Sequence, residues 1–334
     1  MRAWLIILIS LITFNCAFAQ ISFDPMSLSV GAKAMGMGNA YVAVAEDCET
    51  IFSNPAGLGE IDSFRFTSMS ATILEDIQYT LLGGVYPLGE RSAIGIGYVS
   101  TGVNGVEIRD ANGFYIRRAD YSKNLFIFSY GKKFTDKFSL GLNVKHYSES
   151  ATALGNGDGW GLNADIGLLQ KGLGCFSIGA VGQNIINTGK IQYKNGEEGK
   201  LPSNIKVGTK LHIMGNEFEA AILSPIKLSA MLDANISLQA AEPNSLHWGI
   251  EYSPSSYLSF RTGIDQSPKA GGMENNLTYG VSLMVVGLGF HYAYHPYTEY
   301  SDNISHYFSI SFDERGWPFE GVPDTFLGST TTSI

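Results

Sequence analysis

The sequence predicts an all-β protein, namely a transmembrane antiparallel β-barrel of about 14 strands with a short N-terminal helical hatch in its lumen. Three observations predict it: an apolar N-terminal segment with the character of an export signal, apolar and polar residues that alternate over most of the chain, and connections that alternate between long and short. Composition agrees, because only 16% of the 334 residues are charged, against roughly 25% in a typical soluble domain.

Residues 1–19 have the organisation of a signal peptide. Arg2 supplies the positive charge, residues 3–14 are apolar, and Ala17-Phe18-Ala19 fits the small-x-small pattern that precedes a cleavage site. The apolar run is shorter than the ~18 residues of a membrane-spanning helix. We therefore expect an exported protein that loses residues 1–19, and a mature chain in the outer membrane.

Residues 20–62 differ in character from the rest of the mature chain. They are rich in Gly, Ala and Met, then briefly acidic, and they contain few strand signals. Asp47 is placed to cap a short helix that runs through Phe52. Pro55 ends this helix, because the residue before a proline avoids the helical region. We expect the segment to pack in or against the barrel as a hatch; the alternative is a flexible periplasmic leader.

Residues 63–312 form a succession of predicted strands with period two. Over residues 138–145, for example, Phe, Leu, Leu and Val alternate with Ser, Gly, Asn and Lys. A soluble sandwich alternates in the same way, but here the polar face carries small residues and few charges, which is typical of a small or water-filled lumen. Aromatic residues near the strand ends suit a lipid–water interface. The strands are expected to begin near Phe64, Ile77, Arg91, Tyr121, Lys137, Gly159, Gly174, Ser203, Ile226, Ser245, Tyr257, Asn276, Gly287 and Ile304.

The connections between these strands alternate in length. Long polar stretches follow the third, fifth, seventh and eleventh predicted strands, at residues 101–120, 150–158, 185–202 and 266–275. Short connections lie between them, at residues 87–90, 135–136, 170–173 and 254–256. This pattern matches the long outer loops and short periplasmic turns of bacterial outer-membrane barrels. Residues 313–334 have no strand pattern and are expected to form a periplasmic tail.

Composition and spacing exclude several function classes. A net charge of −9 is unsuited to nucleic acid, whose phosphates attract clustered Lys and Arg. Gly36-Met37-Gly38 lacks the third glycine and the strand–helix setting of a dinucleotide-binding loop. His291 and His295 lie ~13 Å apart along one strand and cannot share a metal ion without ligands from other strands. No nucleophile elbow occurs in the sequence, so we expect no enzyme activity, no cofactor and no metal. For Cys48 and Cys175, unpaired thiols are favoured over a disulfide.

Residues 31–47, followed by Asn54-Pro55-Ala56-Gly57-Leu58, resemble the start of FadL-like outer-membrane proteins. Residues 277–312 are similar to the last three strands of the PorV/PorQ and UPF0164-type branch of that superfamily. The resemblance implies a barrel of fourteen strands whose N-terminal hatch blocks the lumen, with Asn54, Pro55 and Ala56 in that hatch. FadL members carry long-chain fatty acids or other hydrophobic compounds across the outer membrane, whereas PorV accepts secreted proteins in type IX secretion. The residues after Pro55 have the generic form of the superfamily rather than that of PorV.

The candidate site residues fall into two groups. The hatch residues Asn54, Pro55, Ala56 and Gly57 are expected to gate the ligand. The second group shares the polar face of the strands and is expected to line the lumen: Lys145, Asp165, Lys206, Lys210, Asp233, Glu251, Arg261 and His291. Opposite charges in this group are expected to pair across neighbouring strands, as Glu251 and Arg261 can. Such a network would hold hatch and wall together; a selectivity lining is the alternative.

The sequence therefore predicts an outer-membrane barrel that transports hydrophobic small molecules such as fatty acids, with outer-membrane lipid and a hydrophobic ligand as its partners. The resemblance implies a lateral gap that releases the ligand into the bilayer, and glycines 83–84, 95 and 97 are candidates for a bulge there. The long loops and the tail suggest an alternative, a PorV/PorQ-like partner of secretion-system proteins. A porin-like barrel without cargo is a third hypothesis.

Overall fold

The computed structural model describes residues 24–110, 112–151, 157–186, 188–215, 226–239, 243–269, 272–297 and 304–316. The predicted signal peptide lies outside these ranges, as do residues 317–334 of the predicted tail. None of the helices in the described ranges has the length and apolar character that crossing a membrane requires.

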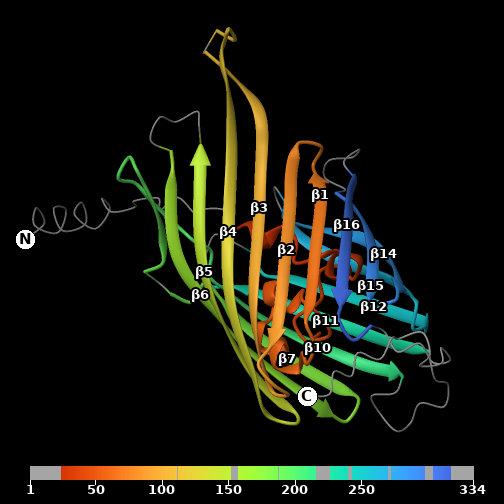
Figure 1. The fold of residues 1–334 in the computed structure, drawn as a ribbon. Coiled ribbons are helices and arrows are strands. Elements are labelled where there is room, and N and C mark those ends of the chain that lie inside the picture. Colours follow the sequence, from red (N-terminus) through yellow and green to blue (C-terminus); the bar gives the residue numbers. More distant parts are fainter. Residues whose placement is uncertain are drawn as a thin grey trace, which may run out of the picture.

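The described residues form one antiparallel sheet of 16 strands, 14 of which close into a barrel (Figure 1). The ring closes because β1 (Arg65–Ile73) pairs with β16 (Ile304–Asp313). The other two strands, β8 (Lys190–Tyr193) and β9 (Glu198–Lys200), form a hairpin attached to β6 (Gly159–Leu173). The prediction of a 14-stranded barrel is confirmed. The remaining wall strands are β2 (Ile77–Pro87), β3 (Ser92–Arg109), β4 (Tyr115–Thr135), β5 (Phe138–Ala151), β7 (Phe176–Gln183), β10 (Asn204–Met214), β11 (Lys227–Ser237), β12 (Ser245–Ser255), β13 (Leu258–Lys269), β14 (Gly272–Val285) and β15 (Leu288–Pro296).

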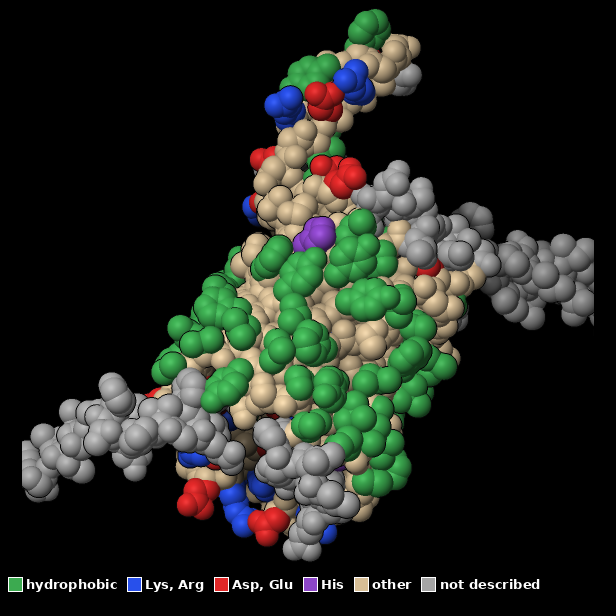
Figure 2. All heavy atoms as spheres, turned by 90° about the vertical axis from the view of Figure 1, so that its right-hand side faces the viewer, with side chains coloured by type: hydrophobic (Ala, Val, Ile, Leu, Met, Phe, Trp, Pro, Cys, Tyr) green, Lys and Arg blue, Asp and Glu red, His purple; other side chains and the backbone are tan. Residues whose placement is uncertain are grey.

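Each wall strand turns one side-chain face outward and the other inward. On β5, Leu142 and Val144 are exposed on the outside, whereas Asn143 and Lys145 are buried inside. Figure 2 shows the result on one side of the molecule, where hydrophobic side chains cover the wall and charged side chains gather towards its ends. The period-two pattern of the sequence is therefore the alternation between the outer surface and the lumen.

The two ends of the barrel differ. At the turn end, tight turns join β2 to β3, β4 to β5, β6 to β7, β12 to β13 and β14 to β15. At the opposite end, which we call the hairpin end, β3 and β4 project well beyond the rim as a two-stranded hairpin (Figure 1).

Three of the predicted loops contain strands instead. The ladder between β3 and β4 continues to Arg109 and Tyr115, so most of residues 101–120 is strand. A register shift after Val103, where Gly105 has a φ of 72°, lets this ladder continue. The ladder between β13 and β14 runs through the predicted loop at 266–275 as far as the pair of Lys269 and Gly272, and β8 and β9 lie within 185–202. The polar sequence of these segments did not indicate strands. Hydrogen bonds between paired strands satisfy the backbone N–H and C=O groups whatever the side chains are.

Residues 24–62 lie inside the barrel as a chain of short helical turns (Figure 1). These turns are η1 (Pro25–Ser27), α2 (Ala32–Gly36), α3 (Thr50–Ser53) and η2 (Pro55–Glu60). The N-cap of α3 is Glu49 and not the expected Asp47, whose side chain instead accepts a hydrogen bond of 2.8 Å from the backbone N–H of Glu49 just before the helix. We call residues 24–62 the hatch.

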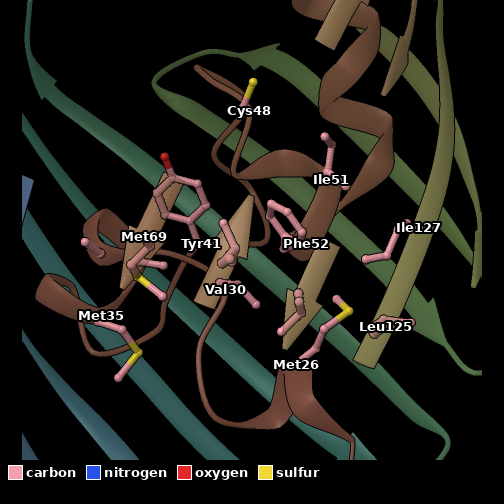
Figure 3. Packing of buried hydrophobic residues seen from close by; sticks show 14 of the residues in the cluster. Met26, Val30, Met35, Tyr41, Cys48, Ile51, Phe52, Met69, Leu125 and Ile127 are labelled. Atoms are coloured by element: carbon pink, nitrogen blue, oxygen red, sulfur yellow. The ribbon is translucent and has the colours of Figure 1, made fainter. Parts of the chain in front are cut away.

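The hatch supplies much of the hydrophobic core. Met35, Ile51, Phe52 and Leu58 are fully buried, and inward-facing wall residues such as Leu125 pack against the same cluster. Figure 3 shows the arrangement, with hatch side chains in the middle and β4 beside them. The lumen is therefore filled by packed protein over the height of the hatch.

Candidate functional site

Asn54 joins the hatch to the wall. Its backbone is extended, and its side-chain oxygen accepts from the backbone N–H of Ala56 at 3.2 Å, which caps η2. Its side-chain amide donates to the carbonyl of Val42 within the hatch and to the carbonyl of Leu168 on β6, both at 2.9 Å. Pro55, Ala56 and Gly57 continue from this anchor and are buried. The candidate gating residues thus lie where the hatch is fixed to the wall.

Three wall glycines lie against the hatch residues that begin at Asn54. Gly131, Gly141 and Gly167 are register partners on the neighbouring strands β4, β5 and β6. A Cβ on any of them would collide with hatch residues 54–58; at Gly141 it would lie 2.1 Å from the carbonyl carbon of Pro55. Only glycine permits such an approach of two backbones. We call these three residues the glycine row. Sequence reasoning missed the row, because its members lie far apart in sequence and align only in the register of the sheet.

Asp233 binds the middle of the hatch from β11. Its carboxylate accepts hydrogen bonds from the backbone N–H groups of Tyr41 and Val42, at 2.6 and 2.8 Å. On β14, the hydroxyl of Thr278 accepts from the backbone N–H of Gly38 at 3.0 Å. Wall side chains therefore satisfy backbone donors of the hatch, which would otherwise be buried without partners.

The other predicted lumen residues face inward and are placed as follows. Lys145 and Asp165 form an ion pair of 2.8 Å in which both side chains are almost fully buried. Glu251 and Arg261 are paired at 2.6 Å across β12 and β13. Lys210 forms an ion pair with Glu46 of the hatch. The ring nitrogens of His291 lie within 2.8 Å of the hydroxyls of Ser282 and Ser311. Lys206 lines the cavity described below. Of these contacts, that between Lys210 and Glu46 joins the wall to the hatch, as do the bonds of Asp233, whereas the other pairs lie within the wall.

The acidic part of the hatch is held by basic side chains. Glu46 binds Lys210, and Asp47 binds Lys33 and accepts from the Tyr41 hydroxyl at 3.0 Å. Glu49 differs, because its side chain is buried and its carboxyl oxygens have no hydrogen-bond partner among the described residues. Burial, together with the neighbouring Asp47 carboxylate, raises the pKa of Glu49 to about 8.

A cavity of about 390 Å³ lies in the lumen towards the hairpin end, between hatch residues 24–39 and the wall strands β10 to β13. Amide, hydroxyl and charged side chains predominate in its lining, among them Asn39, Lys206 and His247. His247 also belongs to a buried chain in which Asp265 binds both His247 and His295 at 2.8 Å. Asp265 was not among the predicted lumen residues, although it shares the polar face of its strand with Arg261.

A second, apolar space lies on the outer surface. This groove of about 510 Å³ is lined mainly by residues of β6, β7 and β10, together with Ile185 and Leu238. The bulge expected at glycines 83–84, 95 and 97 is absent, because the ladder between β2 and β3 runs without a shift through Gln78 to Pro87. Gly83 and Gly97 instead make room for the ring of Phe52. We call this apolar space the outer groove and the polar one the lumen cavity.

The described residues contain no cluster of three or more His, Cys, Asp or Glu that is arranged to hold a metal ion. Cys48 and Cys175, the two cysteines within the described ranges, are free thiols, the first buried and the second exposed.

The described residues thus form a closed antiparallel barrel of 14 strands whose lumen holds an N-terminal hatch. No protein-family model and no curated protein matches the sequence. Solved structures do match in fold.

Three of these structures illustrate the likeness. The toluene transporter TodX of Pseudomonas putida is 14% identical, with a TM-score of 0.57 over 84% of this chain and 96% of that chain. The toluene transporter TbuX of Ralstonia pickettii is 16% identical, with a TM-score of 0.56 over 85% and 98%. A FadL homologue of Pseudomonas aeruginosa is 11% identical, with a TM-score of 0.53 over 85% and 98%. The chain therefore has a FadL-like fold.

Proposed function

We propose that the protein is an outer-membrane barrel that transports hydrophobic small molecules, fatty acids among them. The observation that carries this proposal is the combination of an apolar outer wall with a lumen closed by a hatch that the wall holds at Asn54. Export through a cleaved signal peptide, with both chain ends on the periplasmic side, belongs to the same proposal. Two of the solved structures of this fold are toluene transporters, which supports it.

The packed hatch is inconsistent with an open pore. Water and small solutes would have to cross the cluster around Ile51 and Phe52, which is fully buried. Passage therefore requires either a movement of the hatch or an exit through the wall. We assign the gating role to Asn54, Pro55, Ala56 and Gly57, since Asn54 bonds the hatch to β6 and Pro55 and Ala56 lie against β5 and β6. We assign the holding role to the charged residues of the lumen.

Ligand that copurifies with the protein tests this proposal. The protein is purified in a detergent without acyl chains, extracted with organic solvent, and the extract is analysed by mass spectrometry. We expect fatty acids or other apolar compounds in amounts comparable to the protein. An extract free of apolar compounds, together with unchanged fatty-acid uptake in a strain that lacks the gene, would contradict it.

One observation favours a second function, that of a binding partner in protein secretion. The hairpin of β3 and β4 projects beyond the rim (Figure 1). Around the turn between these two strands it exposes Phe114, Tyr115 and Ile116. Pull-down in mild detergent distinguishes the two functions. Recovery of secretion components by the full chain, and their loss when residues 105–118 are replaced by a short turn, would support this second function.

A further inference from the structure

Three side chains that line the lumen cavity form a chain of polar contacts. Ser245 and His247 lie two residues apart on β12 and therefore share one face of the strand, and Asp265 on β13 is the register partner of His247. The hydroxyl of Ser245 lies 2.9 Å from Nε2 of His247, and Nδ1 of His247 lies 2.8 Å from the Asp265 carboxylate. A hydroxyl, an imidazole and a carboxylate are thus joined in the order of a Ser-His-Asp triad.

The neighbours of His247 determine which ring nitrogen carries the proton. Nδ1 faces two acceptors, the Asp265 carboxylate at 2.8 Å and the carbonyl of Gly38 in the hatch at 3.1 Å. A nitrogen placed between two acceptors donates, so Nδ1 carries the proton of the neutral ring. Nε2 is then unprotonated, and it faces the hydroxyl of Ser245. This tautomer can accept the hydroxyl proton when Ser245 attacks an electrophilic carbon.

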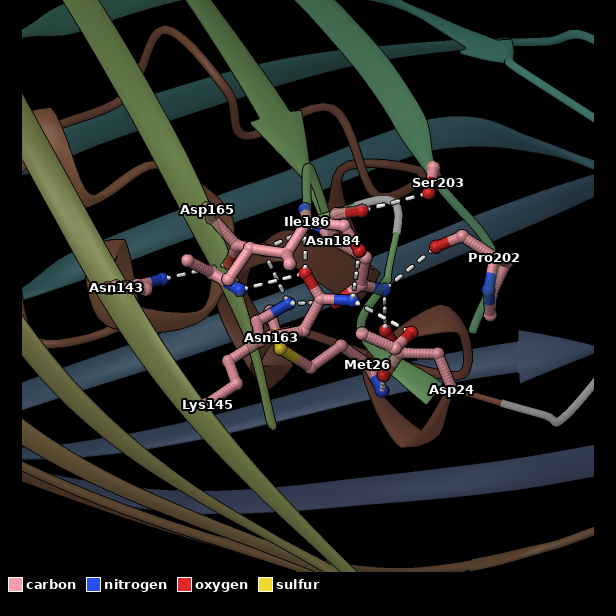
Figure 4. A network of polar contacts seen from close by, with 12 residues as sticks. Asp24, Met26, Asn143, Lys145, Asn163, Asp165, Asn184, Ile186, Pro202 and Ser203 are labelled. Carbon is pink, nitrogen blue, oxygen red and sulfur yellow. Dashed lines mark hydrogen bonds and ion pairs between the residues drawn. The ribbon is translucent and has the colours of Figure 1, made fainter. Parts of the chain in front are cut away.

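Asp265 is held in place from its other side. Its second carboxylate oxygen lies 2.8 Å from Nε2 of His295, a side chain that is fully buried. The other acidic side chain in the cavity lining, Asp24, belongs to a separate network, in which it accepts hydrogen bonds from Asn184 at 2.8 Å and from Tyr147 at 2.9 Å (Figure 4). Asp24 therefore ties the hatch to the wall, whereas Asp265 orients a histidine.

A polar row continues from Ser245 across the wall. Asn235 on β11 is the register partner of Ser245, Lys206 on β10 is the register partner of Asn235, and all three residues line the cavity. Opposite residues of an antiparallel pair have Cβ atoms about 4.5–5.5 Å apart. The Asn235 amide is therefore within reach of a carbonyl group bound at the Ser245 hydroxyl. Side-chain amides and cations stabilise the negative oxygen that forms when a hydroxyl attacks a carbonyl carbon.

Two further amides indicate the chemistry of the ligand. Asn39 of the hatch and Asn204 of β10 line the same cavity, and their side-chain oxygens are buried without a hydrogen-bond partner among the described residues. A buried acceptor without a partner is unfavourable, and a ligand with hydroxyl groups satisfies such acceptors. The volume of about 390 Å³ is that of a site for a small molecule. The ligand that fits is therefore small and carries hydroxyl groups.

We propose that Ser245, His247 and Asp265 are a hydrolytic triad that cleaves a small, hydroxyl-bearing carboxylic ester in the lumen cavity. Oγ of Ser245 attacks the carbonyl carbon and its proton passes to Nε2 of His247. The ester C–O bond then breaks, and the leaving alcohol takes this proton. Water attacks the acyl-serine in the same way, giving its proton to Nε2, which returns it to Oγ as the carboxylic acid leaves. Asp265 acts through His247 as a positioning residue.

This activity goes beyond the proposed transport and does not depend on it. The expectation of no enzyme activity rested on the absence of a nucleophile elbow from the sequence. A triad is defined by the geometry and roles of its side chains, and it can form without that local motif. Here the pairing of β12 with β13 completes it, because that pairing brings Asp265 to His247.

A probe for activated serine tests the site. The protein is purified in detergent and treated with a fluorophosphonate, which phosphonylates an activated serine hydroxyl with loss of fluoride, and mass spectrometry locates the adduct. We expect the adduct on Ser245 of the wild type and its loss in Ser245→Ala and His247→Gln. Ser267→Ala is the matched control, because Ser267 lines the same cavity but accepts a hydrogen bond from Asn276 at 3.2 Å. We expect this variant to be labelled like the wild type.

Hydrolysis of p-nitrophenyl acetate gives a second measurement, and migration of unheated protein on gels shows that each variant is folded. We expect the wild type and Ser267→Ala to hydrolyse the ester and Ser245→Ala to lose this activity. Asp265→Asn should lower kcat and leave KM unchanged, because Asp265 acts on the histidine. Glycerol monoacetate, which carries free hydroxyl groups, should inhibit competitively as an alternative substrate.

Two results would overturn the triad while leaving the proposed transport untouched. One is a folded wild type without an adduct on Ser245, and the other is hydrolysis at equal rates by the wild type and Ser245→Ala. Glycerol monoacetate that neither inhibits nor is hydrolysed would overturn the assigned class of ester. Failure of the wild type to take up a hydrophobic ligand would instead overturn the proposed function and leave the triad standing.

Discussion

At the scale of single residues, Asn54 makes the contacts that most directly hold the hatch. Its oxygen caps η2 while its amide bridges a hatch carbonyl and a carbonyl of β6. Asn54→Ser keeps a capping oxygen but loses the two donated bonds. We expect the free energy of unfolding to fall by about 1–3 kcal/mol for the loss of buried hydrogen bonds, measured by urea unfolding in detergent micelles.

The same substitution distinguishes a purely structural role of Asn54 from a role in gating the lumen. If it gates the lumen, planar-bilayer recordings of Asn54→Ser will show openings that the wild type lacks, because the hatch is released from β6. Unchanged stability and unchanged conductance would show that the bonds to Val42 and Leu168 do not hold the hatch.

Glu49 makes stability depend on pH. Its pKa of about 8 in the folded protein lies above the ordinary value of about 4.3. The folded protein therefore keeps a proton that the unfolded chain releases, and stability falls as pH rises from about 4.5 to 8. Glu49→Gln cannot ionise, so we expect the variant to gain stability relative to the wild type over this range in urea unfolding at pH 4, 6 and 8. A difference between the two proteins that stays constant with pH would contradict this account.

Some residue contacts could be predicted from the sequence and others could not. The pair of Glu251 and Arg261 follows from alternation on two strands joined by a tight turn. The bonds of Asn184 to Asp24 and Pro202 do not, because their partners are brought together by the closure of the barrel and by a loop without periodicity. The alternation of apolar and polar residues shows which face of its strand a residue occupies. Its hydrogen-bond partner, however, depends on the register and curvature of the whole barrel.

At the scale of elements, the wall and the hatch fit through the glycine row. Gly141→Ala places a methyl group against the carbonyl of Pro55, so we expect lower thermal stability and a loosened hatch. Gly84→Ala is the matched control, because a Cβ at Gly84 meets no atom within 4 Å. Circular dichroism melts in detergent compare them, and equal melting temperatures of the two variants would show that the close approach at Gly141 is unimportant.

The starts of the strands could be predicted from the sequence where one side-chain face of the strand had to be apolar. Expected and observed starts differ by one or two residues for most wall strands, but β4 and β14 begin well before the expected positions, at Tyr115 and Gly272. Both early starts lie at the hairpin end, where neither face of the strand needs to be apolar and hydrophobicity marks no boundary. Residues 20–62 could be distinguished from the wall for the opposite reason, since the composition changes abruptly at the first wall strand.

At the scale of the whole molecule, the lumen and the outer surface differ in polarity. The lumen cavity is lined mostly by polar side chains and includes Lys206, whereas the outer groove is mainly apolar. A purely apolar ligand would leave buried polar groups without hydrogen bonds, at about 1–3 kcal/mol each. We therefore expect oleic acid to be taken up in preference to toluene, measured by competition between the two in cells that express the protein. Stronger inhibition by toluene than by unlabelled oleic acid would contradict this preference.

The central claim is that the barrel carries a hydrophobic ligand across the membrane that its apolar wall faces. Uptake of radiolabelled oleic acid tests it most directly, in a Gram-negative host without its own fatty-acid transporter that carries either the gene for the wild type or an empty vector. We expect uptake well above the vector control, with the wild type found in the outer-membrane fraction. Uptake no greater than that of the vector control, from protein that is folded and present in that fraction, would contradict it.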